Sequence, residues 1–131
     1  MKDLICDQFQ NSVEEVLIRH KSILDIITKI QESSSRVNRA VIKAVTNCGC
    51  IKIDASSYEV PDGINYKDAK DYIDNHLRGQ LCEVCKEKIT EEIGRSLFYI
   101  AALSNDLDIN LYDVMINECK KIEALGKFSL Y

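Results

Sequence analysis

The amino-acid sequence predicts an all-α protein, a bundle of four to five helices with a short extended, cysteine-bearing loop insertion. Apolar residues recur at three- and four-residue steps over most of the chain, whereas the alternation typical of a half-buried strand is confined to one short stretch. The chain has 131 residues, which is enough for one packed core without disulfide bonds. We therefore expect a single domain over residues 1–131.

The strongest helical pattern runs from Ser22 to about Asn47. Its apolar stripe consists of Ile23, Ile26, Ile27, Ile30, Val37, Val41, Ala44 and Val45. Ser22 can cap the start of this helix, and Gly49 follows its last turn, where helices often stop on a glycine. A shorter helix is expected before it, over Val13–His20, because apolar residues there also follow a helical spacing.

The middle of the chain follows a different pattern. Ile51 and Ile53 alternate with polar residues, which predicts a short extended segment, and turn-forming residues follow as far as Asn65. Residues 66–78 return to helical spacing, and Gly79 is expected to end that helix. This region is the predicted insertion between the main helices.

Two further helices are predicted in the last third of the chain. One starts near Cys85 and should break at the turn-forming triplet of residues 104–106, Ser-Asn-Asp. The other begins after Asp108 or Asn110, either of which can act as its cap, and stops at Gly126. The apolar residues of both helices recur at helical spacing, so each can present one face to a core.

Composition restricts the classes of function. Hydrophobic residues make up 46% and charged residues 29% of the chain, as in ordinary globular proteins. No apolar run approaches the roughly 20 residues that cross a bilayer, so no membrane partner is expected. The net charge of −4 argues against nucleic acid as a partner. The N-terminal segment has acids where a secretory signal has a basic and then an apolar region, which predicts a cytoplasmic location.

Four of the six cysteines form two close pairs, Cys48 with Cys50 and Cys82 with Cys85. The first pair ends one long helix and the second opens another, so antiparallel packing of these helices could bring all four together. Because cytosolic thiols stay reduced, four such thiols suit a closed, tetrahedral structural zinc site. The alternatives are redox or disulfide chemistry, an iron–sulfur cluster, and unrelated thiols.

The second half of the chain carries an ordered series of motifs. Glu91-Glu92-Ile93-Gly94-Arg95 is followed by the apolar segment 97–103, a turn, residues 107–114 and an Asn117-x-x-Lys120 ending. This order and spacing resemble the second half of the MazG-like nucleotide pyrophosphohydrolases. Residues 30–41 resemble the first acidic helix of that family. The two segments cover roughly half the chain, and residues 48–85 lie outside the resemblance.

The resemblance implies a MazG-like fold, assembly into a homo-oligomer (a dimer or tetramer), and Mg²⁺-dependent hydrolysis of nucleoside triphosphates. Family members hold Mg²⁺ with Glu-x-x-Glu on one helix and Glu-x-x-Asp on another. In this chain those four positions are Ser33, Arg36, Glu92 and Arg95. Only Glu92 keeps a carboxylate, with Glu32 beside the first position. Two guanidinium groups oppose a bound cation, which predicts a lost metal site.

The two arginines allow two interpretations. In one, Glu32 pairs with Arg36 and Glu92 pairs with Arg95, and these salt bridges neutralise a former metal site. In the other, Arg36 and Arg95 bind phosphate directly through bidentate guanidinium contacts. Both interpretations remove Mg²⁺ from the site.

We therefore expect a catalytically degenerate MazG-like domain with a structural tetracysteine metal site, which binds a nucleotide or a protein and has a regulatory role. A nucleotide would contact Arg36 and Arg95 and, by resemblance to the family, Asn117 and Lys120. The alternative is an active house-cleaning pyrophosphohydrolase with a rebuilt acidic site. Its catalytic residues would be Glu92 and Glu32, and only this alternative requires Mg²⁺.

Overall fold

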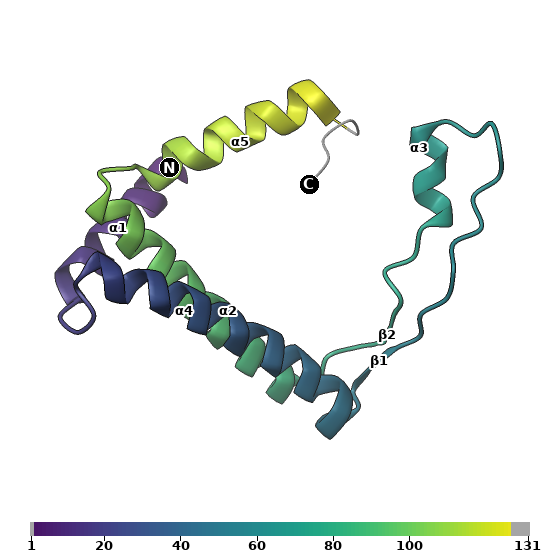
Figure 1. Ribbon diagram of the computed structural model, residues 1–131, viewed down its shortest axis with the longest axis horizontal. Coiled ribbons are helices and arrows are strands. Elements are labelled where there is room, and N and C mark those ends of the chain that lie inside the picture. The colour runs from purple at the N-terminus through teal and green to yellow at the C-terminus, as the bar shows by residue number, and fades with distance from the viewer. Residues whose placement is uncertain (1, 127–131) are drawn as a thin grey trace.

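A computed structural model describes residues 2–126 and is mostly helical, as the sequence predicted (Figure 1). Its α-helices are α1 (Lys2–Val16), α2 (Ile23–Lys43), α3 (Tyr66–Ala69), α4 (Glu83–Asp106) and α5 (Leu111–Leu125). A π-helical turn, Ala44–Cys48, extends α2, and a 3-10 turn, Lys70–Tyr72, follows α3. Two short strands, β1 (Ile51–Ile53) and β2 (Leu77–Gly79), form an antiparallel ribbon.

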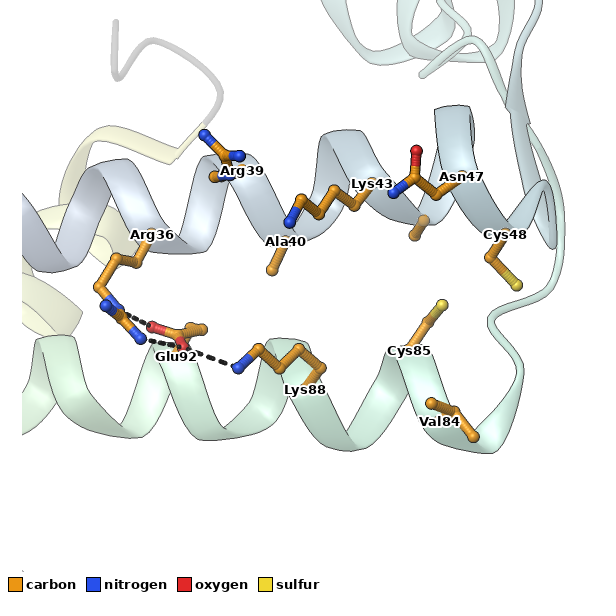
Figure 2. Close-up of a pocket in the computed structure, with 11 residues that line it drawn as sticks. Arg36, Arg39, Ala40, Lys43, Asn47, Cys48, Val84, Cys85, Lys88 and Glu92 are labelled. Carbon is orange, nitrogen blue, oxygen red and sulfur yellow. Dashed lines mark hydrogen bonds and ion pairs between the residues drawn. The ribbon is translucent and has the colours of Figure 1, made fainter.

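The central unit is the pair of long helices α2 and α4, which make the most extensive contact between elements. They lie side by side and run antiparallel (Figures 1 and 2). α1 packs against α4 and α5 packs against α1, while the rest of α5 leads away from the pair. The core lies where α1 meets α2 and α4, and its buried residues are Val13, Ile26, Ala101 and Ala102.

Local signals explain several helix ends. The Ser22 hydroxyl accepts a hydrogen bond from the Leu24 amide at 3.3 Å, so it caps α2 as predicted. Gly49 has a φ of 78° and ends the π-helical turn in the left-handed conformation that glycine adopts readily. Of the two caps predicted for α5, Asn110 is the one that acts, because its side chain accepts from the Asp113 amide at 3.0 Å.

The first helix differs from its predicted bounds of Val13–His20. α1 begins at Lys2 and ends at Val16, and His20 has a φ of 56°, which no α-helix contains. The apolar pattern did not predict the first turns of α1, because the buried position at residue 10 is occupied by a polar residue, Gln10, which is 6% exposed. Its amide donates to Asn105 Oδ1 at 3.1 Å, so a distant contact supports this part of the helix.

The predicted helix over residues 66–78 is correct only in its first turns. Residues 77–79 instead form β2, with Leu77 opposite Ile53 and Gly79 opposite Ile51. The side chains of Asp74 and Asn75 accept hydrogen bonds from the backbone amides two residues further on, at 3.1 and 2.9 Å. Such local bonds compete with helix formation and turn the chain toward the strand.

Helix α4 is longer than predicted at both ends. It begins at Glu83, and it passes through the predicted break at residues 104–106. The polar side chains of that triplet are bonded within the fold, since the Ser104 hydroxyl donates to the Ile100 carbonyl at 2.9 Å and Asn105 donates to the Gln10 carbonyl at 2.9 Å. The turn therefore falls after Asp106 instead.

The ribbon and residues 54–76 form an arm that extends away from the helices (Figure 1). The arm joins the α2–α4 pair at the end opposite the core. Gly79 is required at this junction, because a Cβ there would lie 2.6 Å from the Cys50 carbonyl oxygen, and its φ is 84°. None of the described helices has the length and apolar character needed to span a bilayer.

Candidate metal centre and charged groove

The four paired cysteines meet at the base of the arm. Cys48 ends the π-helical turn and Cys50 precedes β1, while Cys82 and Cys85 belong to the start of α4. Their sulfur atoms all lie within 4.8 Å of one another. The antiparallel packing of α2 and α4 thus brings the two pairs together, as the sequence predicted.

The spacing of the sulfur atoms is compatible with one metal ion. In a tetrahedral site with metal–sulfur bonds of about 2.3 Å, neighbouring sulfurs lie roughly 3.8 Å apart. The Cys48 and Cys82 sulfurs are separated by 3.7 Å. A disulfide requires about 2.05 Å between sulfurs, and all four cysteines are free thiols in this structure.

Three of the four thiols, those of Cys48, Cys82 and Cys85, have displaced pKa values, and that of Cys48 is raised. The pKa of Cys82 falls to about 7, because the Cys85 amide donates to its sulfur at 3.4 Å and the Cys85 thiol also donates to it. The pKa of Cys85 rises to about 12, because its proton is held in that hydrogen bond with Cys82 and because burial disfavours its thiolate. Cys82 is thus the thiol of this pair that deprotonates first, and metal binding removes the protons of the others.

Glu92 lies in the middle of α4 and faces α2, with only 2% of its surface exposed. Both oxygens of its carboxylate accept hydrogen bonds from Arg36, with Nε–Oε2 at 2.9 Å and Nη2–Oε1 at 3.3 Å (Figure 2). Arg95 Nη1 lies 3.2 Å from Oε2 and Lys88 Nζ lies 3.6 Å from Oε1. The hydrogen bonds from Arg36 are the main reason that the pKa of Glu92 is lowered.

The salt bridge predicted between Glu32 and Arg36 does not form, because each side chain has a different partner. Arg36 pairs with Glu92 across the helix interface, whereas Glu32 pairs with Lys29 at 3.1 Å. A buried carboxylate on the facing helix offers Arg36 a bidentate contact, which is stronger than an exposed pair within one helix. The predicted pair of Glu92 with Arg95 is present. Ser33 is buried, and its hydroxyl donates to the Ile30 carbonyl at 2.9 Å.

Asn117 and Lys120 lie on exposed positions of α5. Helix α5 leads away from the α2–α4 pair (Figure 1), and neither residue lines the two cavities beside Arg36. Asn117 and Lys120 therefore do not belong to the candidate site within a single chain.

Two cavities flank the contact between Arg36 and Glu92. The first has a volume of about 260 Å³, and we call it the arginine pocket. It is lined by Lys29, Glu32, Ser33, Arg36, Arg95 and Tyr99. The second has a volume of about 390 Å³, lies between Arg36 and the cysteines, and is called here the cysteine-side cavity (Figure 2). The two cavities follow one another along the interface of α2 and α4.

Sequence reasoning did not identify Lys88 or Lys43 as site residues. Lys88 precedes Glu92 by four residues, a spacing that places both on one face of a helix and could have indicated the contact. The place of Lys43 in the wall of the cysteine-side cavity depends on how α4 packs against α2, which no sequence pattern indicates.

No protein-family model, curated protein or solved structure significantly matches this chain. The resemblance to the MazG-like family stays a prediction from the sequence motifs.

Proposed function

We propose that this chain is a non-hydrolytic MazG-like domain that binds a nucleotide through its phosphate groups and is held together by a structural zinc ion. The observation that carries the proposal is the environment of Glu92. Its buried carboxylate accepts hydrogen bonds from Arg36 and Arg95 and lies close to Lys88. The one acid that remains at the four motif positions is thus already compensated by three cations.

A magnesium ion at this carboxylate would have to displace those cations. Two unit charges of the same sign 4 Å apart repel by about 4 kcal/mol in the partly screened environment near a protein surface. Mg²⁺ carries twice that charge and would meet two guanidinium groups and an ammonium group. Mg²⁺ binding and metal-activated hydrolysis are therefore disfavoured at Glu92.

Phosphate binding uses the same arginines without a metal. The side chains of Arg36 and Arg95 are 46% and 44% exposed, so part of each guanidinium group is open to a ligand. Each group has five N–H donors, and the contacts with Glu92 occupy only some of them. Lys29 adds a further cation at the edge of the arginine pocket. A phosphate there would receive charge-assisted hydrogen bonds from both helices.

Titration of the zinc-loaded protein with ATP in buffer free of Mg²⁺, without a chelator, tests this proposal. We expect a rise in melting temperature without Mg²⁺, and at least about tenfold weaker binding in Arg95→Ala, which is the loss of about 1.4 kcal/mol. Arg19→Ala, a change at an exposed arginine outside the arginine pocket, should bind ATP as the unchanged protein does.

Assays of pyrophosphate release separate this proposal from the alternative function. A non-hydrolytic domain releases none from a panel of nucleoside triphosphates. Mg²⁺-dependent release that is abolished by Glu92→Gln would contradict the proposal and establish the rebuilt pyrophosphohydrolase site of Glu92 and Glu32.

The proposed zinc site consists of Cys48, Cys50, Cys82 and Cys85. The supporting observation is the mutual approach of four sulfur atoms, a ligand set that suits Zn²⁺ and leaves no open position for substrate. Bound zinc would supply structural energy, since it joins the end of α2 to the start of α4 and to β1.

Metal analysis tests the identity of this ion. We expect a colourless protein with one zinc per chain, and Co²⁺ replacement should give the absorption of a tetrahedral cobalt thiolate. Cys82→Ser should reduce the zinc content, whereas Cys6→Ser, at a cysteine outside the cluster, should not. A brown, iron-containing protein would identify an iron–sulfur cluster instead.

We also propose that the chain forms a homo-oligomer, a dimer or tetramer. The chain exposes 10339 Å² of surface, whereas a compact monomer of this mass exposes about 7,000 Å². The excess of about 3,300 Å² is at least as large as the half that one chain contributes to a permanent interface. Many large apolar side chains are exposed on the outer helices, among them Leu4, Ile5, Val114, Met115 and Ile122. Sedimentation that gives a monomer at micromolar concentration would contradict this proposal.

A further inference from the structure

The cysteine-side cavity is separate from the arginine pocket and has a different chemical character. Its volume of about 390 Å³ falls in the range of about 300–1,000 Å³ that is typical of small-molecule sites. Ala40 and Ala44 line it from α2 and Val84 lines it from α4. These small apolar side chains leave room between the helices, so the cavity can accept an apolar group.

Cations outnumber acids around this apolar space. Lys43 and Lys88 both line the cavity, and Figure 2 shows their ammonium groups extending along the groove toward the Arg36 end. Among the side chains that the structure describes, Lys43 has no ion-pair partner. Glu92 is the one acidic residue in the lining, and Arg36 and Arg95 already bind it. The cavity therefore favours a ligand that carries negative charge.

The two ends of the cavity differ in charge. Cys48 and Cys85 lie at one end, and the ammonium groups point toward the other (Figure 2). The lysine end attracts an anionic group, whereas the described lining at the cysteine end holds no cation. A ligand with a charged head and an apolar body thus has one favoured orientation.

We propose that the cysteine-side cavity binds a small organic anion, with its carboxylate, sulfonate or phosphate head between Lys43 and Lys88 and its apolar body against Ala40 and Ala44. A neutral molecule would leave Lys43 without a counter-ion, while Lys88 would have only the carboxylate of Glu92, which it shares with two arginines. A bare phosphate would leave the apolar wall unfilled, so neither matches the cavity as well as an amphipathic anion. Arg36 lines both cavities, but Arg95 lines only the arginine pocket, so substitution of Arg95 acts on the proposed nucleotide site alone.

Binding of 8-anilinonaphthalene-1-sulfonate to the metal-loaded protein tests the proposal. This probe combines an aromatic body with a sulfonate, and we expect one bound molecule per chain by calorimetry and fluorescence. Decanoate, which has the same combination, should displace it. Inorganic phosphate or 1-octanol at equal concentration should not, because each lacks one of the two parts. Equal displacement by 1-octanol would overturn the role of the lysines.

Matched variants locate the site. Lys43→Glu should weaken binding at least tenfold, whereas Lys86→Glu, the same change at an exposed position outside the cavity, should not. Ala40→Leu should weaken it by filling the cavity, and Asn38→Leu, on the same helix outside the cavity, should not. Circular dichroism must first establish that each variant is folded, since the probe also binds partly unfolded chains.

Unchanged binding in both Lys43→Glu and Ala40→Leu would overturn the proposal. Absence of probe binding in a folded oligomer would also overturn it, because a second copy of the chain would then fill the cavity. Arg95→Ala should abolish tight ATP binding but leave binding of the sulfonate unchanged. Failure of the nucleotide proposal is therefore distinguishable from failure of this one.

Discussion

Glu92 is buried among cations, and the charge of its carboxylate is matched by groups from both helices. Arg36 reaches it from α2, while Arg95 and Lys88 reach it from the same face of α4. The cations are about half exposed, so each can be solvated when the acid is removed, but the acid itself cannot leave the interface. Because the acid is buried while its cations are half exposed, Glu92 contributes to the stability of the helix pair as well as to the charge of the two cavities.

Substitution Glu92→Gln should lower the urea midpoint of unfolding. The amide keeps the shape of the side chain but loses the charge that the three cations bind. Glu91→Gln, at the exposed neighbouring position, should change the free energy of unfolding by no more than about 0.5 kcal/mol. An equal effect of the two changes would contradict the structural role of Glu92.

The stability of the protein should also depend on pH through this residue. The pKa of Glu92 in the folded chain is lowered from its ordinary value of 4.5, so folding favours the ionised form. The stabilisation is therefore complete above that value and is lost as the pH falls through the lower pKa of the folded state. Urea unfolding between pH 7 and pH 3 measures it.

Glu92→Gln should lose less stability over this acid range than the unchanged protein. Asp74, whose pKa is lowered to about 2 by Arg78, and the cysteines contribute to acid unfolding in both proteins, so the difference isolates Glu92. Parallel pH profiles would argue against a charged Glu92 in the folded state.

At the level of whole elements, one polar side chain connects α1 to the turn between α4 and α5. Gln10 donates to the Ile109 carbonyl at 2.9 Å and accepts from the Leu111 amide at 2.7 Å. The main-chain carbonyl of Gln10 also accepts a hydrogen bond from the Asn105 side chain at 2.9 Å. The side chain thus sets where α4 ends and how α5 leaves it.

Gln10→Leu should destabilise the protein by about 1–3 kcal/mol, the cost of buried polar groups that lose their partners. The Leu111 amide and the Ile109 carbonyl would be the groups left without those bonds. Gln8→Leu, at an exposed position of the same helix, serves as the control. Chemical unfolding measures both, and a loss in Gln10→Leu no larger than in the control would show that these bonds contribute nothing net.

Across the whole molecule, the core and the cysteine cluster stand at opposite ends of the α2–α4 pair. The buried apolar cluster involves α1, α2 and α4, whereas the arm is joined to the helices where the four cysteines meet. The proposed metal would therefore stabilise the end of the molecule that has few apolar contacts.

Removal of the metal should destabilise mainly the end of the α2–α4 pair where the four cysteines meet. A strong chelator should lower the melting temperature and expose residues 54–76 to limited proteolysis, while the helices around Ile26 remain protected. Readdition of Zn²⁺ should restore protection. Mass spectrometry locates the cuts, and cleavage that is equally fast with and without the chelator would contradict a metal-supported arm.

Much of the helical structure is predictable from residues that are close in sequence. Ser22, the apolar stripe that follows it and Gly49 specify the first long helix, and the structure confirms it. The cysteine cluster was predictable because each pair lies at the end of a long helix, and antiparallel packing of two helices brings such ends together.

The sequence by itself determined the periodic helices and their caps and placed the two cysteine pairs at helix ends, because these features depend on local hydrogen bonds and regular spacing. The packing of α2 against α4 then brought the four thiols together. Only the tertiary structure decided that residues 77–79 form a strand and that Gln10 lies inside a helix. It also decided that Arg36 binds Glu92 and not Glu32. Those outcomes depend on partners far away in the chain, and burial of a carboxylate makes a distant bidentate contact stronger than a nearby exposed one.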